Sequence, residues 1–137
     1  MTEHLRPQDK FDICYSHFRR CRAMMHKIGI INPMASCKKA WRPYAGVKVM
    51  DYCADFSRVG QNALRRPRWA SRLTLFQLYH LEEVGYRVIL SHLRIRPGTF
   101  DWWVQDVKRE VGKELEGGKL WPPRNYFTGE PEDDAGW

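Results

Sequence analysis

The 137-residue sequence has no long hydrophobic run and no extended strand-like alternation. No apolar stretch approaches the ~18 residues that a membrane-spanning helix needs, which excludes a transmembrane protein. The N-terminal segment MTEHLRPQDK is polar and lacks a signal-peptide core, so we expect a cytoplasmic protein with reduced cysteines. An apolar content of 43% excludes wholesale disorder. Together these features predict a small all-α protein.

Sequence motifs of catalysis are also missing. The chain contains no phosphate-binding glycine loop, no nucleophile elbow and no HExxH helix. Glu82 and Glu83 are adjacent and diverge, whereas Asp101 and Asp106 lie ~140° apart on a helix, so neither pair suits shared acid–base or metal chemistry. We therefore expect no catalytic residue and no enzymatic activity.

The four cysteines, at positions 14, 21, 37 and 53, form no CxxC pair. Cys14 and Cys21 fall on the apolar face of one predicted helix, which favours buried thiols over a zinc site. We expect no metal ion and no other cofactor.

Positive charge is concentrated in the first half of the chain. The formal net charge is +7, with 14 basic and 5 acidic side chains in residues 1–70 and 9 basic and 11 acidic ones in residues 71–137. A basic half suits a polyanionic partner, because each Lys or Arg beside a phosphate releases a condensed counterion. The alternative is a solvated basic surface that maintains solubility.

Helical periodicity divides the chain into three parts. A helix over residues 9–28 and another over 44–57 give a basic helical N-terminal region at 1–64. In the second helix we expect Val47, Met50 and Ala54 to point inward, with Cys53 as a further candidate. Gly60 and the RRPRW stretch form a linker into a helix-turn-helix domain at 65–127. The segment KLWPPRNYF closes that domain as an extended arm, and residues 128–137 form a flexible acidic tail.

The second half has the order of a helix-turn-helix unit. Ser71 is placed to cap a helix that continues to about Glu83, and Gly85 ends that helix. A short helix at 86–93, a turn at 94–96 and a long helix from Pro97 to about Leu115 follow. The buried face of the long helix is marked by Val104, Val107, Val111 and Leu115. Its N-terminal part is then free to enter a DNA major groove.

The stretch LFQLYHLEEVGYRVILSHLRIRPGTFDWWVQDVKREVGKEL resembles region four of bacterial sigma factors over residues 75–115. The matching positions are Leu81-Glu82-Glu83, Gly85-Tyr86, Ile89, Leu93-Arg94-Ile95, Gly98-Thr99-Phe100 and Leu115. Arg94 replaces the turn glycine, and Asp101, Trp102 and Trp103 stand where such helices usually carry Arg or Lys. The chain shows no likeness to the sigma region that binds the minus-ten element, so the resemblance implies an isolated module, as in small phage or mobile-element regulators.

The resemblance implies double-stranded DNA as a partner, and we expect its contacts at three places. The turn contributes Arg94 and Arg96, and Thr99 either caps the long helix or contacts a phosphate. Gln105 and Arg109 point away from the valines, and Lys108 lies at the edge of that stripe. The linker adds Arg65, Arg66 and Arg68. Trp102 points away from the core and is the candidate residue for a protein partner.

Three functional hypotheses stay open at this stage. The first is a DNA-binding, transcription-associated protein, which in bacteria would act at the nucleoid and could pair as a homodimer on two half-sites. The second is a protein-interaction module that binds RNA polymerase or another DNA-bound protein through the same scaffold. The third is a binder of single-stranded nucleic acid that uses Trp41, Tyr44 or Trp69 for base stacking.

Overall fold

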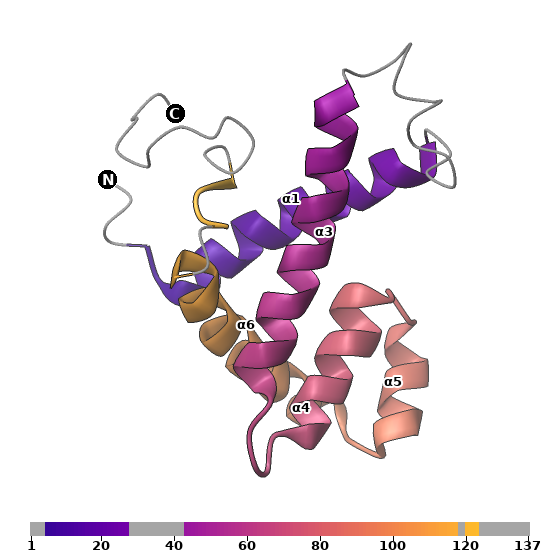
Figure 1. Cartoon of the computed structure of the whole chain (residues 1–137). Coiled ribbons are helices and arrows are strands. Elements are labelled where there is room, and N and C mark those ends of the chain that lie inside the picture. Colours follow the sequence, from indigo (N-terminus) through magenta and orange to yellow (C-terminus); the bar gives the residue numbers. More distant parts are fainter. Residues whose placement is uncertain (1–4, 28–42, 118–119, 124–137) are drawn as a thin grey trace.

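The structure is a computed structural model that describes residues 5–27, 43–117 and 120–123, and all of its regular structure in these ranges is helical. The prediction of an all-α protein is thereby confirmed for this part of the chain. In Figure 1, α1, α3 and α6 cross one another, and α4 and α5 lie beside the lower part of this group. The elements are α1 (Pro7–Lys27), α3 (Pro43–Leu64), α4 (Ala70–Leu75), the π-helix η2 (Phe76–Leu81), α5 (Tyr86–Leu93) and α6 (Pro97–Gly117). None of the helices described is long and apolar enough to cross a bilayer.

Helix α1 buries the face that its apolar spacing predicts. Phe11, Cys14, Phe18 and Cys21 are each at most 4% exposed, and they recur every three or four residues on one side of the helix. The Phe18 ring stacks on Phe56 of α3 with the ring centroids 4.7 Å apart. Aromatic packing therefore joins α1 to α3 at the centre of the core.

Helix α6 packs closely against α1, and its inward face consists of the predicted Val104, Val107, Val111 and Leu115. Gly112 lies in the same buried row. A Cβ atom at that position would lie 2.0 Å from the carbonyl oxygen of Pro7, so the two backbones approach more closely than any larger residue permits.

Helix α3 is longer than predicted, because it continues through Gly60 to Leu64. The linker prediction at Gly60 was wrong for a packing reason. A Cβ atom there would lie 2.2 Å from the ring of Phe76, so this glycine makes room for an aromatic side chain and does not end the helix. The predicted boundary at residue 65 coincides with the actual end of the helix.

The inward face of α3 was also predicted incorrectly. Met50 is 37% exposed and Ala54 is exposed, whereas Val49, Tyr52 and Phe56 are at most 4% exposed. The buried set lies on a neighbouring stripe of the helix that carries the two large aromatic rings. Burying these rings removes more apolar surface from water than burying Met50 and Ala54 would.

The helix before the turn is built differently from the prediction. Trp69, not Ser71, occupies the N-cap position of α4, and no side chain caps this end. The helix then widens into η2, where Glu82 donates its N–H to the carbonyl of Gln77. This wider turn carries His80, which is 1% exposed and whose Nδ1 atom has no hydrogen-bond partner in the described structure. Burial lowers the pKa of His80 to about 3, so the ring is neutral at ordinary pH.

Residues 120–123 of the predicted arm pack back onto the helices. Leu120 is fully buried, its N–H donates to the carbonyl of Leu115, and its carbonyl accepts a hydrogen bond from the Cys14 thiol over 3.4 Å. Lys10 lies over the Trp121 ring. One core thus contains side chains from both the predicted N-terminal region, 1–64, and the predicted helix-turn-helix domain, 65–127. The predicted acidic tail at 128–137 lies outside the described residues.

We predict that Gly112→Ala lowers the free energy of unfolding by about 1–3 kcal/mol, because α1 and α6 must separate to admit the methyl group. Urea denaturation followed by circular dichroism measures this change. Gly98→Ala is the matched control in the same helix. Nothing lies within 4 Å of its added Cβ, so this variant should be as stable as the wild type or more stable by up to about 1 kcal/mol. Equal stability of the Gly112→Ala variant and the wild type would contradict the close approach.

Candidate nucleic-acid interface

The turn between α5 and α6 has a defined backbone. Arg94 ends α5 in the left-handed conformation with φ of 56°, and its N–H bonds to the carbonyls at the end of that helix. Ile95 donates its N–H to the carbonyl of Leu90, which closes the turn. The predicted helix at 86–93, the turn at 94–96 and the start of the long helix at Pro97 are confirmed. Because α6 starts at Pro97, Thr99 lies within its first turn, and the prediction of Thr99 as a cap was wrong.

One buried ring joins the elements around this turn. Phe100 of α6 is 4% exposed and meets the rings of Tyr79 and Tyr86 edge-on, with centroids 5.0 and 4.9 Å away. These residues come from η2 and α5, and Ile89 of α5 is fully buried beside them. Aromatic contacts therefore set how the short helix and the long helix lie relative to each other.

Three exposed arginines lie on α5 and the turn that follows it: Arg87 in the first turn of α5, and Arg94 and Arg96 in the turn itself. Their side chains make no hydrogen bond or ion pair with any described residue. The exposed Asp101 is the single acidic residue between positions 86 and 102. This end of the molecule therefore carries an uncompensated positive charge.

A shallow hollow of about 420 Å³ adjoins these arginines at the start of α6. It is lined by Arg96, Gly98, Thr99 and Trp102. The first backbone N–H groups of a helix have no intrahelical acceptor and carry partial positive charge. The hollow thus combines a guanidinium, a hydroxyl and free N–H groups, all of which bind anions, with one aromatic wall.

The side chain of Trp102 is 71% exposed, as its position opposite the valines predicts. The described arm residues, 120–123, contact α1 and the end of α6 instead of Trp102. Gln105, one turn further along α6, is exposed on the same helix. Tyr86 and Val88 of α5 are also exposed, at 41% and 60%.

Lys108 does not extend into solvent from α6. Its ammonium group forms an ion pair with Asp12 of α1 over 3.0 Å, and its side chain is only 24% exposed. Lys108 thus already has an anionic partner within the protein, and its role as a nucleic-acid contact stays a prediction. The sequence placed it correctly at the edge of the valine stripe, but that edge lies against α1.

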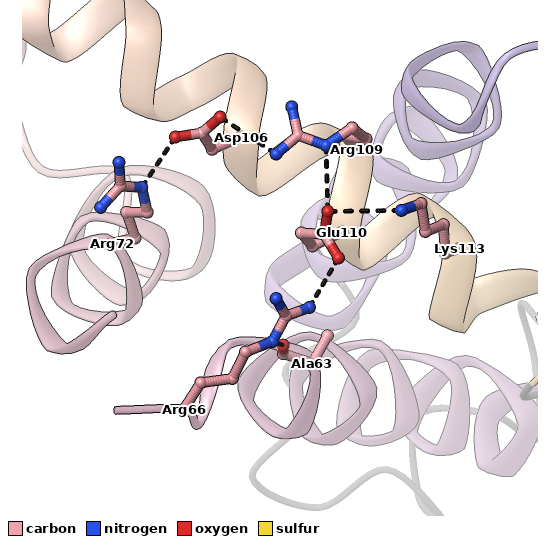
Figure 2. Close-up of polar contacts among 7 residues, drawn as sticks. All are labelled: Ala63, Arg66, Arg72, Asp106, Arg109, Glu110 and Lys113. Atoms are coloured by element: carbon pink, nitrogen blue, oxygen red, sulfur yellow. Dashed lines mark hydrogen bonds and ion pairs between the residues drawn. The ribbon is translucent and has the colours of Figure 1, made fainter. Parts of the chain in front are cut away.

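Two carboxylates on α6 engage four basic side chains, as Figure 2 shows. Asp106 accepts hydrogen bonds from Arg72 Nε over 2.8 Å and from Arg109 over 3.2 Å. Glu110 accepts hydrogen bonds from Arg66 over 2.6 Å, from Arg109 Nε over 2.9 Å and from Lys113 over 3.4 Å. We call these six residues the α6 ionic network. Arg66 and Arg109 belong to it, so both predicted phosphate contacts already have anionic partners within the protein.

The carboxylate of Glu110 is strongly favoured in its charged form. Its side chain is only 11% exposed, and this burial opposes ionisation. Hydrogen bonds from Arg66 and Arg109, together with the charge of Lys113, prevail and lower the pKa of Glu110 to about 2. The network therefore stays ionised throughout the neutral range.

The ring of Trp69 is covered by two arginines. The guanidinium groups of Arg66 and Arg72 lie 4.7 and 4.8 Å from its centroid, and Arg72 also lies 5.2 Å from the Trp103 ring. Base stacking on Trp69 would require these cations to leave. Trp41 and the side chain of Tyr44, the other proposed stacking groups, lie outside the described residues.

Arg65 and Arg68 in the loop between α3 and α4 are exposed. Among the described residues, the Arg65 side chain donates a hydrogen bond only to the neutral Asn62 Oδ1 atom, over 3.3 Å. Arg68 has a φ of 71°, and its side chain makes no hydrogen bond, ion pair or ring contact with the described residues. Among the predicted phosphate-binding arginines, Arg65, Arg68, Arg94 and Arg96 thus have no acidic partner in the described structure.

Arg72 and Arg87 are functional candidates that sequence reasoning missed. Arg87 could have been found, because it precedes the buried Ile89 by two residues and so points away from it on a helix. Two partners of Arg72, Trp103 and Asp106, are 31 and 34 residues away in sequence, and no local pattern indicates such contacts.

Nothing in the described part of the chain groups three or more His, Cys, Asp or Glu side chains in a way that could hold a metal ion. Cys14, Cys21 and Cys53 are free thiols that pack in or beside the core, and Cys37 lies outside the described residues. Burial raises the pKa of Cys14 to about 12, so this thiol stays protonated.

No family model, curated protein or solved structure matches this chain. The resemblance to region four of sigma factors stays a prediction, and the functional argument rests on the arrangement of the charged side chains.

We predict that Glu110→Gln lowers the free energy of unfolding by about 1–3 kcal/mol at neutral pH, because three cations lose their shared anionic partner. The folded-state pKa of about 2 lies below the ordinary 4.5, so this contribution is complete above about pH 4.5 and is lost as the pH falls towards 2. Urea denaturation at about pH 7 and about pH 3 measures the change. The exposed Glu114, changed to Gln, is the control and should have little effect. A stability difference of the same size at both pH values would disprove the ionic origin.

Proposed function

We propose that the protein binds double-stranded DNA through the α5–α6 turn and the first turns of α6. One observation carries this proposal: Arg87, Arg94 and Arg96 are exposed and lack acidic partners, whereas the cations further along α6 are paired. Counterion release makes such uncompensated arginines favourable contacts for phosphate. Paired arginines would first have to give up their carboxylates.

The shape of this end supports a duplex as the ligand. A major groove admits one α-helix. Helix α6 follows a short helix and a tight turn, which is the order of elements in a helix-turn-helix unit. Trp102 and Gln105 project from the leading part of α6, where a groove-binding helix contacts base edges. Thr99 and the free N–H groups of the first turn are placed beside the arginines to bind a backbone phosphate. We therefore propose that the chain is a transcription-associated DNA-binding protein.

We predict that a labelled random-sequence duplex binds with a log–log salt slope at least as steep as about −3, since the three arginines of this site each neutralise one phosphate at ~0.9 unit. Arg94→Gln combined with Arg96→Gln should reduce that slope by about two units. Fluorescence anisotropy across a salt series measures both values. The control is Arg6→Gln combined with Arg58→Gln, which removes the same charge from two exposed arginines that each pair with an aspartate three residues away.

An equal loss of slope in the control variant would show that net charge alone drives binding, and would overturn the assignment to the turn. Stronger binding of a single strand than of the duplex would favour the third hypothesis. Circular dichroism confirms that each variant is folded, and both pairs are exposed enough that their stability should change little.

A protein-interaction module is the second candidate, and the exposure of Trp102 favours it. Large exposed aromatic side chains are typical of binding hot spots, and Val88 and Tyr86 add apolar surface on the neighbouring α5. The natural partner of such a surface is RNA polymerase or another DNA-bound protein.

For this candidate we predict that Trp102→Ala weakens a pull-down of RNA polymerase by at least about tenfold, in line with the loss of one hot-spot residue, while duplex affinity changes less. Met50→Ala, which truncates an exposed apolar side chain on α3, is the control. Retention of the polymerase by the Trp102 variant would count against this candidate. Loss of duplex binding together with polymerase binding would indicate that Trp102 belongs to the DNA interface.

A further inference from the structure

We infer that the loop between α3 and α4, residues 65–69, is a second phosphate-binding site for the same duplex. The inference rests on the proposed function of the α5–α6 turn and adds a second region of contact to it. Its phosphate-binding residues are Arg65 and Arg68, and the neighbouring Arg66 is a positioning residue.

The two loops lie at the same end of the molecule. In Figure 1, α3 runs down to the first loop, α4 returns upward, and α5 runs down again to the turn before α6. Helix α4 contacts α3, α5 and α6, so it lies between the two loops. Its first turn is joined to the leading half of α6, where Arg72 bonds to Asp106 and lies over the Trp103 ring. One rigid block therefore carries both loops.

The loop is held in place by the side chains of Arg66 and Trp69. Trp69 donates its backbone N–H to the carbonyl of Arg66, and the Arg66 guanidinium lies over the Trp69 ring while it bonds to Glu110. Arg66 also donates to the carbonyl of Ala63 at the end of α3. These contacts fix the backbone of the loop without using Arg65 or Arg68.

The left-handed conformation of Arg68 is informative. Positive φ is unusual for a residue other than glycine, asparagine or aspartate and stores a small strain. At this position the chain carries an exposed arginine with no acidic partner in the described structure. Arg65 and Arg68 thus form a pair of exposed arginines without acidic partners among the described residues. The α5–α6 turn has the same feature in Arg94 and Arg96.

A duplex suits two such pairs better than a flexible strand does. Its phosphates repeat along a stiff helix, so two loops on one rigid block can bind phosphates at separate positions at no additional ordering cost. The α5–α6 turn would then place α6 in the groove while the α3–α4 loop holds the flanking backbone.

The test compares salt slopes on one duplex of about two helical turns, or ~20 base pairs. We expect Arg65→Gln combined with Arg68→Gln to reduce the slope by about two units and Arg65→Lys combined with Arg68→Lys to keep it, since phosphate contacts require charge and not a planar guanidinium. The full chain is used throughout, with the Arg94/Arg96 and Arg6/Arg58 glutamine variants measured in parallel.

The four arms separate this inference from the proposed function. Loss of slope in the Arg65/Arg68 glutamine variant and in the Arg94/Arg96 glutamine variant supports both the second site and the proposed function. If only the Arg94/Arg96 variant loses slope, the second site is disproved and the proposed function stands. If only the Arg65/Arg68 glutamine variant loses slope, the phosphate contact of the α3–α4 loop stands and the proposed binding through the α5–α6 turn is disproved. If the wild type does not bind the duplex, both are disproved. Failure of the lysine variant to keep the slope would show that Arg65 and Arg68 act through structure and would also overturn the inference.

Discussion

The close packing of α1 against α6 is the constraint on which the rest of the structure depends. It brings Gly112 against the backbone of Pro7, buries the valine face of α6 and places Lys108 beside Asp12. Because α6 is held along this face, only its leading turns and its outer side remain exposed. Helix α3 then covers both helices with Tyr52 and Phe56, and Leu120 closes the core beside Cys14.

The α6 ionic network separates the arginines that are paired within the protein from those that are exposed without an acidic partner in the described residues. Asp106 and Glu110 join α6 to α4 and to the end of α3, so the arginines that bond to them have a structural role. The arginines of the two loops face solvent without acidic partners in the described residues. Net charge in the sequence does not distinguish these two classes, although only the second is available to a polyanion.

Sequence patterns predicted the second half of the fold well because its signals are local. A glycine break, a short helix, a three-residue turn and a valine stripe at helical spacing place α5 and α6 within a few residues of their observed bounds. The same spacing also placed Trp102 outward. In α3 the local signals misled, since Gly60 is a packing residue and Met50 lies on the solvent side.

The candidate site could be predicted only in part. Arg94, Arg96 and the loop arginines were identified from their positions in turns, but the pairing of Arg66, Lys108 and Arg109 depends on contacts across the fold. Asp12 and Lys108 are 96 positions apart, and nothing in either segment indicates the other. A list of basic residues therefore overestimates the binding surface until the tertiary partners are known.

The burial of Glu110 and Asp106 has a practical consequence for handling the protein. Ions in solution screen exposed charges strongly and partly buried pairs much less. The carboxylates of the network are only 11% and 13% exposed, whereas the loop arginines are open to solvent. If the protein binds DNA as proposed, a moderate salt wash should remove the nucleic acid well before it loosens the fold.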